Sequence, residues 1–490
     1  MSVNKQKSLK INFIMNVILT MSSFVFPLIT FPYVSRVLFP SGTGKVSFAM
    51  SFITYFSMFA QMGIPTYGIR ACAKVRDNKE KLSKTVQEIL IINLVMCIIV
   101  YAAFFTSLVI IPRVRQDRTL FLIMGSMIAF NAIGVEWLYK ALEKYSYITI
   151  RSIIFKLIAL LLMFALIHSK EDYIVYGGIA IFASSASNIF NFINLRKYVN
   201  MKPQKNYNFR QHVNMILIFF AMSVAATIYT NLDTVMLGFM KTDTDVGYYN
   251  AAVKIKSILV SVVTSLGTVL LPRASYYIEQ NSLDEFYRIS KKAINFIFVI
   301  AIPIVVYFIL FAEEGVYFLS GKAYMGAILP MRIIMPTVLF IGITNILGIQ
   351  MMVPLGREKQ VLYSEITGAI VDLVLNIIFI PQYGAAGAAF GTLAAEVVVC
   401  IWQMLAMRKD FSKLFMSIKY WLLFVATAIS GIVAVQVKAI GAGYFMCLLL
   451  SGICFLTIYG TILLIGREGL VIEVIGQLEE RIARYRSSNR

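Results

Sequence analysis

Histidine and cysteine, which supply many metal ligands and nucleophiles in enzymes, are scarce in this chain. It has only two His, His168 and His212, and five Cys among 490 residues. No pair of Cys has the CxxC spacing of a metal or redox site, and all five lie in or beside apolar segments, which favours packing roles. The sequence therefore excludes a His cluster for a metal and a His-dependent acyl transferase, and we expect no cofactor.

Charged residues are also few. They make up 14% of the chain, whereas 59% is hydrophobic and the mean hydropathy is +0.76. A soluble domain typically carries about 25% charged residues. We therefore expect an all-α polytopic membrane protein that is not an enzyme. No loop between apolar runs exceeds about 20 residues, which leaves no room for a soluble catalytic domain. The GxxxxGK[ST] motif of ATP hydrolysis is absent from the sequence.

Apolar runs of roughly 20 residues predict about fourteen transmembrane helices. Their centres lie near Phe24, Phe59, Val100, Phe130, Leu160, Phe182, Ala225, Val262, Val305, Leu339, Leu373, Ala394, Ala428 and Phe455. Lys and Arg concentrate in alternate loops if the N-terminus is cytoplasmic, so both termini are predicted to be cytoplasmic. The main exception is "PRVRQDR" (112–118), which places three Arg on the predicted outer side.

An internal repeat relates the two halves of the chain. When Gly44 is aligned with Gly247, Ala49 falls on Ala252. An offset of six helices preserves orientation, and two six-helix lobes with a site at their interface are a common transporter plan. The predicted divisions are a first lobe of helices 1–6, a second lobe of helices 7–12, and two extra helices with a basic tail, at residues 1–212, 213–407 and 408–490.

Three segments carry a resemblance to a known family. The first, "FPLITFPYVSRVLFPSGTGKVSFAMSFITYFSMFAQMGIPTYGIRACAK", joins a proline-broken helix to a Gly after a short turn and to "MGIPTYGIR". The others are "NLDTVMLG" followed by "VGYYNAAVKI", and "VPLGREKQVLYSEITGAIVDLVLNIIFIPQYGAAGAAFGTLAAE" (353–396). In this order they resemble Wzx-type polysaccharide flippases, whose superfamily also holds multidrug exporters and the peptidoglycan-precursor flippase.

The resemblance implies a V-shaped pair of six-helix bundles with alternating access. Such a protein would move an undecaprenyl-pyrophosphate-linked oligosaccharide from the inner to the outer leaflet of a bacterial cytoplasmic membrane, as a monomer. Besides membrane lipids, its partners would include a polysaccharide polymerase. In this family, basic residues on the first, second and eighth helices face the cavity, which implies substrate contacts for Arg36, Arg70 and Lys254. Arg70 could instead end its helix at the cytoplasmic surface.

The charge of a pyrophosphate group gives a separate reason to look for cations within spans. An unpaired charge in hydrocarbon costs several kcal/mol or more, so a protein that moves such a group needs cations along its path. Lys254 begins a polar stripe that continues through Ser257, Ser261 and Ser265 at helical spacing. Lys256 lies about 200° around the helix, on an apolar face. We therefore expect Lys254 to line the cavity. For either Lys, the alternative is snorkelling toward the headgroups.

Other ionisable and helix-bending residues in the first eight spans have two interpretations each. Asp233 is expected either to pair with Lys254 or to cap the following turn. Pro27 and Pro32 interrupt a polar first span, and because proline bends a helix this span is predicted to be a gate. Polar helix–helix packing is the alternative. Lys156 is expected near a cytoplasmic helix end, in an interfacial role.

The second lobe offers candidates for coupling. Arg332 lies between two prolines and is a further candidate for the cationic cavity. Glu365 and Asp372 fall on one helix face, and acidic groups within spans often bind H⁺ or Na⁺. Asp372 is the preferred coupling residue, whereas Glu396 is as well explained by helix packing.

Two other functions remain open at this point. A drug or cation exporter of the same superfamily would favour an acidic, aromatic cavity over Lys and Arg. A membrane polysaccharide polymerase would carry a large external loop with catalytic groups, and the outer loops here are short. "TDTD" (242–245) contains the Asp-x-Asp pattern of metal-binding glycosyltransferases, but it lies in a short turn and is interpreted as turn chemistry.

Overall fold

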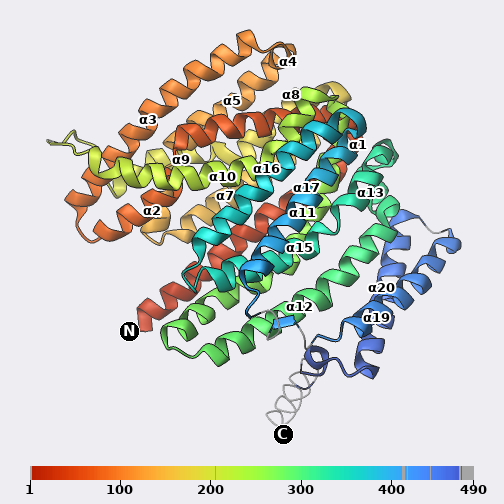
Figure 1. The fold of residues 1–490 in the computed structure, drawn as a ribbon. Helices are drawn as coiled ribbons and strands as arrows, with labels where there is room; N and C mark the ends of the chain where they lie inside the picture. Colours follow the sequence, from red (N-terminus) through yellow and green to blue (C-terminus); the bar gives the residue numbers. More distant parts are fainter. Residues whose placement is uncertain are drawn as a thin grey trace, which may run out of the picture. The chain divides into compact units, whose positions relative to one another are not determined.

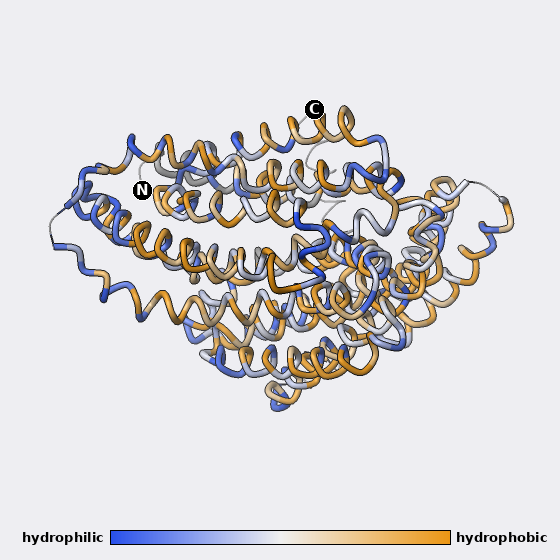
Figure 2. The backbone as a smooth tube through the Cα atoms, turned by 90° about the horizontal axis from the view of Figure 1, so that it is seen from above, coloured by the Kyte–Doolittle hydropathy of each residue, from blue (hydrophilic) through white to orange (hydrophobic). Residues whose placement is uncertain are grey.

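The structure of this chain is a computed structural model, which describes residues 3–204, 206–410, 414–415, 418–441, 443–473 and 476. Within these ranges the chain forms helices and connecting turns, without a β-strand, as the all-α prediction requires. In Figure 2, hydrophobic residues dominate the helices and hydrophilic residues gather toward many of their ends. Apolar runs form helices because a helix satisfies its backbone hydrogen bonds internally, as hydrocarbon demands.

Twelve helices of the described chain are long and apolar enough to cross a membrane, and one bent pair, Lys322–Ile334 with Thr337–Met352, raises this to 13. One of the twelve, Ile14–Val75, has 62 residues. A straight helix of that length would extend for roughly 90 Å at 1.5 Å per residue, about three times the hydrocarbon thickness. The backbone of this segment leaves helical dihedral angles at Phe39. Counted as two spans, it brings the total to about fourteen, as predicted.

Packing divides the chain into two compact units, Met1–Gly247 and Tyr248–Arg490. The described helices of the first unit (Figure 1) are α1 (Val3–Gln61), α2 (Ile64–Val75), α3 (Lys79–Ile110), α4 (Pro112–Gln116), α5 (Arg118–Ile133), α6 (Glu136–Ala141), α7 (Tyr145–Leu166), η1 (Lys170–Asp172), α8 (Tyr173–Ile181), η2 (Phe182–Ala186), α9 (Asn188–Asn194), η3 (Leu195–Lys197) and α10 (Arg210–Met240). The centre of this unit is α1, which packs against α3, α5, α7, α8 and α10.

The helix α11 (Asp243–Glu279) begins at the end of the first unit and continues into the second. The further described helices of the second unit are α12 (Leu283–Leu310), α13 (Ala312–Ser320), η4 (Lys322–Ala327), α14 (Ile328–Ile334), α15 (Thr337–Thr344), η5 (Asn345–Met352), α16 (Glu358–Tyr383), α17 (Ala385–Ala406), α19 (Tyr420–Gln436), η6 (Val437–Ile440) and α20 (Tyr444–Ile465). In this unit α17 packs against α14, α15 and α16. The two extra helices, α19 and α20, lie side by side (Figure 1) and pack on α12 and α13.

The division at Gly247 groups α10 with the first unit, because α10 packs against α1 and α2. The sequence placed the lobe boundary at residue 212, before this helix, on the basis of the repeat. The boundary by packing therefore lies one helix later than the boundary by sequence similarity. The assignment of lobes by repeat stays a prediction.

Large apolar side chains cover much of the helix surface. Ile98, Phe424 and Ile465 are 72%, 72% and 78% exposed. Water-soluble proteins rarely expose large contiguous apolar patches, whereas a surface in lipid gains nothing from hiding them. Together with the spans, this exposure identifies a multi-pass membrane protein.

The two glycines aligned by the internal repeat pack against each other's turns. A Cβ atom on Gly44 would lie 1.7 Å from the Asp243 carbonyl oxygen, and one on Gly247 would lie 2.1 Å from the Pro40 carbonyl oxygen. The contact is therefore reciprocal. Each glycine permits the backbone of the other turn to approach, which only a residue without a side chain allows.

Candidate functional site

The two predicted cations of the first unit lie far apart along the chain's helical path. Arg36 is exposed in α1, and its Nη1 donates a hydrogen bond to the Pro32 carbonyl oxygen at 2.6 Å. Arg70 is exposed in α2. Between them α1 continues for about 22 residues beyond Phe39, roughly 33 Å of helix. A single phosphate cannot bridge that length, so the two cations would serve different stages of transport if both contact substrate.

The structure distinguishes Lys254 from Lys256. Lys254 is exposed on α11, and so is Ser257, the next residue of its polar stripe. Lys256 is half-buried, and Val263 on its face is fully buried. On that face a Cβ on Gly267 would lie 2.4 Å from the Asn345 side-chain oxygen of η5. The stripe headed by Lys254 is therefore the open side of α11, and the Lys256 side is packed.

Lys156 lies in the middle of a span rather than at a helix end. It is eleven residues into α7, which begins at Tyr145 and ends at Leu166. Its Nζ donates hydrogen bonds to the hydroxyl oxygens of Ser22 at 2.9 Å and Ser23 at 3.1 Å. The predicted position of Lys156 near a helix end is thus wrong. The structure instead sets this ammonium against the polar stripe of α1.

The prolines of the proposed gate lie in continuous helix. Pro27 and Pro32 are both half-buried within α1. The non-helical dihedral angles of α1 fall at Phe39 (φ 57°, ψ 176°), near Pro40, rather than at either of these prolines. The reversal between the first two spans is therefore made at Phe39, and the gate role of Pro27 and Pro32 stays a prediction.

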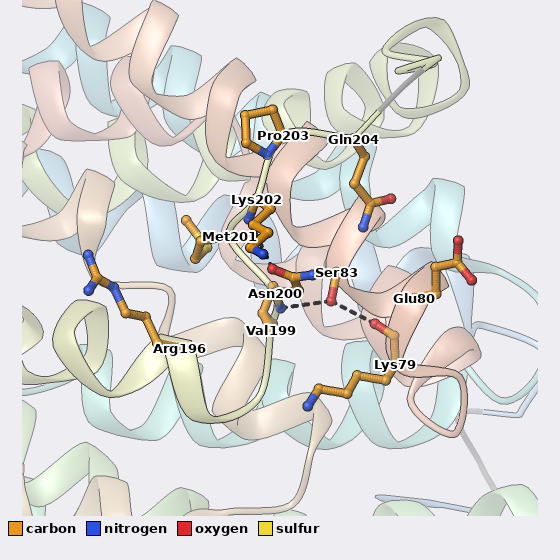
Figure 3. Close-up of a pocket in the computed structure, with 10 residues that line it drawn as sticks. All are labelled: Lys79, Glu80, Ser83, Arg196, Val199, Asn200, Met201, Lys202, Pro203 and Gln204. Atoms are coloured by element: carbon orange, nitrogen blue, oxygen red, sulfur yellow. Dashed lines mark hydrogen bonds between the residues drawn. The ribbon is translucent and has the colours of Figure 1, made fainter.

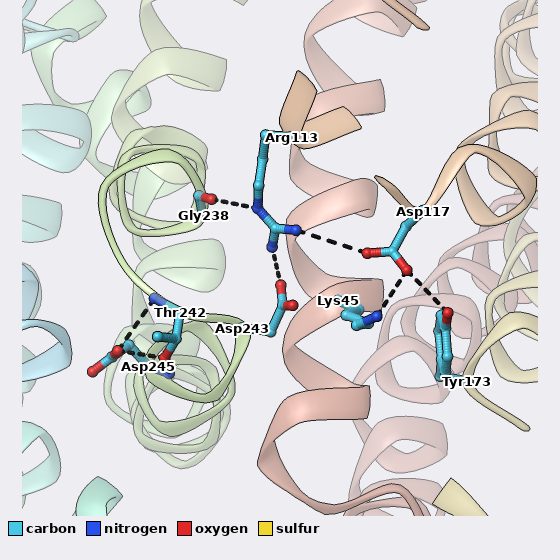
Figure 4. Close-up of polar contacts among 8 residues, drawn as sticks. All are labelled: Lys45, Arg113, Asp117, Tyr173, Gly238, Thr242, Asp243 and Asp245. Carbon is cyan, nitrogen blue, oxygen red and sulfur yellow. Dashed lines mark hydrogen bonds and ion pairs between the residues drawn. The ribbon is translucent and has the colours of Figure 1, made fainter. Parts of the chain in front are cut away.

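A network of charged side chains joins four segments of the first unit (Figure 4). Its centre is Asp117, which is 9% exposed and lies in the turn between α4 and α5. Asp117 Oδ1 accepts hydrogen bonds from Lys45 Nζ at 2.8 Å and from the Tyr173 hydroxyl at 2.9 Å. Asp117 Oδ2 lies 3.7 Å from Arg113 Nη1. A carboxylate that compensates two cations holds α1, α4 and α8 together at this end.

Arg113 extends the network to the turn between α10 and α11. Its Nε donates to the Gly238 carbonyl oxygen at 2.9 Å, and its Nη2 forms an ion pair with Asp243. The Arg113 guanidinium also lies over the Phe48 ring, 5.1 Å from its centroid. One planar guanidinium thus serves partners in three directions, a geometry that Lys cannot reproduce.

The acidic turn "TDTD" has two separate roles. Asp243 pairs with Arg113, whereas Asp245 accepts a hydrogen bond from the Thr242 hydroxyl at 2.6 Å. Among the described residues there is no group of three His, Cys, Asp or Glu side chains that could hold a metal ion. These contacts agree with the interpretation of this segment as turn chemistry.

A buried histidine network lies at the start of α10. His212 Nε2 lies 2.8 Å from Glu88 Oε2, and His212 Nδ1 lies 2.6 Å from the Tyr67 hydroxyl. Glu88 also accepts hydrogen bonds from the Asn208 backbone N–H and from the Gln211 side chain. The network ties α2, α3 and α10 together.

The acidic candidates of the second unit differ in their surroundings. Asp372 is 2% exposed in α16, facing α17, where a Cβ on Gly391 would lie 3.0 Å from its Oδ1. Glu396 is buried in α17. Glu365 is exposed, because it does not lie on the buried face of α16, whose residues recur about every fourth position. The structure therefore separates Glu365 from Asp372, although both fall near one helix face in the sequence.

Asp233 and Arg332 complete the predicted set. Asp233 is 7% exposed in α10, and it interacts with a neighbouring group. It lies in the first unit and Lys254 in the second, and their pairing stays a prediction. Arg332 is exposed in α14.

Sequence reasoning missed the charged network, the histidine network and the position of Lys156. One signal for the charged network was present: the Arg-rich segment 112–118 on the predicted outer side, which contradicted the expected distribution of positive charge. In the folded chain Arg113 is held by carboxylates and a carbonyl group. The Lys156 position required helix ends, which hydropathy does not locate accurately.

Comparison with known proteins finds similarity along most of the chain. The family described as "Polysaccharide biosynthesis protein" matches residues 9–278, and the family described as MatE matches residues 218–378. The chain is 26% identical over 416 residues to a putative O-antigen transporter of Escherichia coli strain K12, a match that covers 84% of this chain and 99% of that protein.

Solved structures share the fold. The lipid II flippase MurJ in an inward closed conformation has a TM-score of 0.74 at 14% identity, over 94% of this chain and 100% of that chain. A multidrug resistance transporter of the MATE family in an inward-facing conformation has a TM-score of 0.62 at 13% identity, over 82% and 98% of the two chains. At these identities the likeness establishes a common fold.

Proposed function

The chain belongs to the polysaccharide biosynthesis protein family, and from this membership we propose that it is a flippase for a lipid-linked oligosaccharide. Its cargo would be a sugar repeat unit joined through pyrophosphate to undecaprenol, moved from the cytoplasmic to the outer leaflet for surface polysaccharide synthesis. The similarity to O-antigen transporters over most of both chains supports this assignment. The protein is a transporter and not an enzyme.

The observation that carries the proposal is the presence of cations inside spans. Lys156 is bonded to two serine hydroxyls in mid-span, and Lys254 heads the exposed stripe of α11. Neither has a carboxylate at ion-pair distance among the described residues. An ammonium so placed is costly in hydrocarbon unless it meets water or an anion. A pyrophosphate headgroup is an anion that would offset the cost during transport.

We propose supporting roles for the remaining predicted residues. Arg36, Arg70 and Arg332 would contact the pyrophosphate or the acidic parts of the glycan, and Asp233 would hold a cavity cation in place until substrate binds. Asp372, buried between α16 and α17, would bind the coupling H⁺ or Na⁺, with Glu365 as a more exposed second carboxylate. Pro27 and Pro32 would give α1 the flexibility of a gate.

Location and partners follow from the same proposal. The chain would reside in a bacterial cytoplasmic membrane with both termini cytoplasmic, since most of the 45 Lys and Arg fall in alternate loops. It would work as a monomer beside a polysaccharide polymerase that consumes its product in the outer leaflet.

The test is flipping in proteoliposomes of a fluorescent undecaprenyl-pyrophosphate oligosaccharide. We expect wild type to flip it, and Lys156→Met and Lys254→Met to lower the rate about tenfold or more, the worth of a charge-assisted contact. Lys256→Met is the matched control, since Lys256 lies two residues away on the packed side of α11. A wild type that flips no such lipid contradicts the function. Equal flipping rates for wild type and all three variants contradict the role of Lys156 and Lys254 but not the flippase function.

A further inference from the structure

A basic hollow, here called the α3 hollow, opens where α3 begins (Figure 3). It has a volume of about 900 Å³ and lies between the first residues of α3 and the segment that follows η3. Lys79, Arg196 and Lys202 contribute three cations to its lining, and Glu80 contributes the single carboxylate. In Figure 3, Glu80 lies on the opposite side of the drawn segment from Arg196.

The three cations of the α3 hollow are available to a ligand. Lys79, Arg196 and Lys202 are all exposed. Among the described residues, none of their side chains forms an ion pair or a hydrogen bond, whereas ten other pairs of a Lys or Arg with an Asp or Glu form ion pairs. Three uncompensated positive charges around one hollow repel each other, and an anion removes that repulsion.

The wall of the α3 hollow is held by neutral hydrogen bonds. Gln87 Nε2 donates to the carbonyl oxygens of Asn200 at 2.6 Å and Lys202 at 3.0 Å. The Asn200 backbone N–H donates to the Ser83 hydroxyl at 3.0 Å, as Figure 3 shows. The segment is therefore fixed on α3 without using the cations. A preformed site loses less entropy when a ligand binds than a flexible loop would.

A second basic hollow, in the other unit, uses two of its cations in internal contacts. It is lined by Lys292, Lys419 and Arg467 among other residues, in a volume of about 450 Å³. There Lys292 pairs with Glu473 at 2.8 Å, and Lys419 donates to the carbonyl oxygens of Gly466 and Arg467 at 3.1 and 3.0 Å. Those cations hold the described end of the chain in place. The α3 hollow lacks such internal partners among its described neighbours.

We propose that the α3 hollow binds the headgroup of an anionic glycerophospholipid of the cytoplasmic leaflet. Under the orientation of the proposed function, on which this inference rests, the hollow lies at the cytoplasmic ends of its helices. There a cation gains about 1 kcal/mol from anionic lipid. The volume of about 900 Å³ suits a phosphate with its glycerol and headgroup rather than a bare phosphate ion. Bound lipid would fix the first unit at the membrane surface while other helices move.

The experiment measures binding of dioctanoyl-phosphatidylglycerol to the full chain in a neutral detergent. Dioctanoyl-phosphatidylcholine and inorganic phosphate are the comparison ligands. We expect saturable binding of phosphatidylglycerol, and affinity about a hundredfold weaker in the triple variant Lys79→Gln/Arg196→Gln/Lys202→Gln. The control removes the same charges elsewhere at the same predicted side: Lys74→Gln/Lys144→Gln/Arg210→Gln, all exposed residues. This control should change affinity less than threefold.

Several results would overturn the proposal. If phosphatidylcholine binds as tightly as phosphatidylglycerol, the α3 hollow does not recognise the negative charge of the lipid. If inorganic phosphate binds as tightly as phosphatidylglycerol, the α3 hollow is a site for free phosphate. An equal loss in the control triple variant shows a diffuse surface charge effect. Lys79→Arg with Lys202→Arg should keep binding, which separates lost charge from lost folding. Because no flipping is measured, a failure here leaves the transport function standing, and a failure to flip leaves this binding site standing.

Discussion

At the residue scale, Asp117 shows how one carboxylate can organise a helix end. It compensates Lys45 and Arg113 and accepts from the Tyr173 hydroxyl. We expect Asp117→Asn to lower the free energy of unfolding by about 1–3 kcal/mol, because two partly buried cations lose their shared anion while the side-chain shape is kept. Denaturant unfolding of the purified protein in detergent measures it.

The matched control for this change is Glu171→Gln. Glu171 pairs with Lys170 at 3.8 Å, and both side chains are about 70% exposed. An exposed pair of this kind contributes little, so the control should lie within about 0.5 kcal/mol of wild type. If Asp117→Asn is as mild as the control, the network is no more than a surface contact.

Residue pairing is also where the sequence was least informative. Lys45 and Asp117 lie 72 residues apart, and Arg113 and Asp243 lie 130 apart. Nothing in hydropathy or spacing says which cation meets which carboxylate over such lengths. The sequence could place Lys254 on an open stripe because that inference needs only one helix period. It could not find that Lys156 reaches the hydroxyls of α1.

At the element scale, the crossing of the α1 turn and the start of α11 depends on two glycines. We expect Gly44→Ala to destabilise the fold by more than about 2 kcal/mol, because its Cβ would lie 1.7 Å from the Asp243 carbonyl oxygen and the backbones would have to separate. The change is read as a lower midpoint of thermal unfolding in detergent.

Gly460→Ala is the control at this scale. Gly460 lies within α20, and a Cβ there meets nothing within 4 Å. Ala favours a helix over Gly by roughly 1 kcal/mol, so this variant should be as stable as wild type or slightly more stable. A Gly44→Ala protein with an unchanged midpoint would mean that the two turns do not need their close approach.

Helices were predicted from the sequence more accurately than contacts between residues. Long apolar runs form the helices found here, since hydrocarbon leaves the backbone no other partner than itself. Helix ends and breaks were less predictable. The bend assigned to Pro27 stays a prediction, whereas the backbone leaves helical dihedral angles at Phe39. A proline removes one hydrogen bond, whereas tertiary packing decides where a chain reverses.

At the scale of the whole chain, ion pairs form on both predicted sides of the membrane. On the predicted outer side Arg113 pairs with Asp243, and on the predicted inner side Arg76 pairs with Glu143 and Lys292 with Glu473. The pairing of cations therefore does not distinguish the two sides, and the predicted orientation rests on the concentration of Lys and Arg in alternate loops.

Thiol labelling of intact cells tests that orientation directly. Glu171 and Lys144 are both exposed and lie in connections on opposite predicted sides. We expect a membrane-impermeant maleimide to label Glu171→Cys in intact cells, and Lys144→Cys only after permeabilisation. Four of the five native Cys are buried and the fifth is partly buried, so wild type sets a low background. The reverse pattern would place the termini outside, and it would also move the α3 hollow away from the cytoplasmic leaflet.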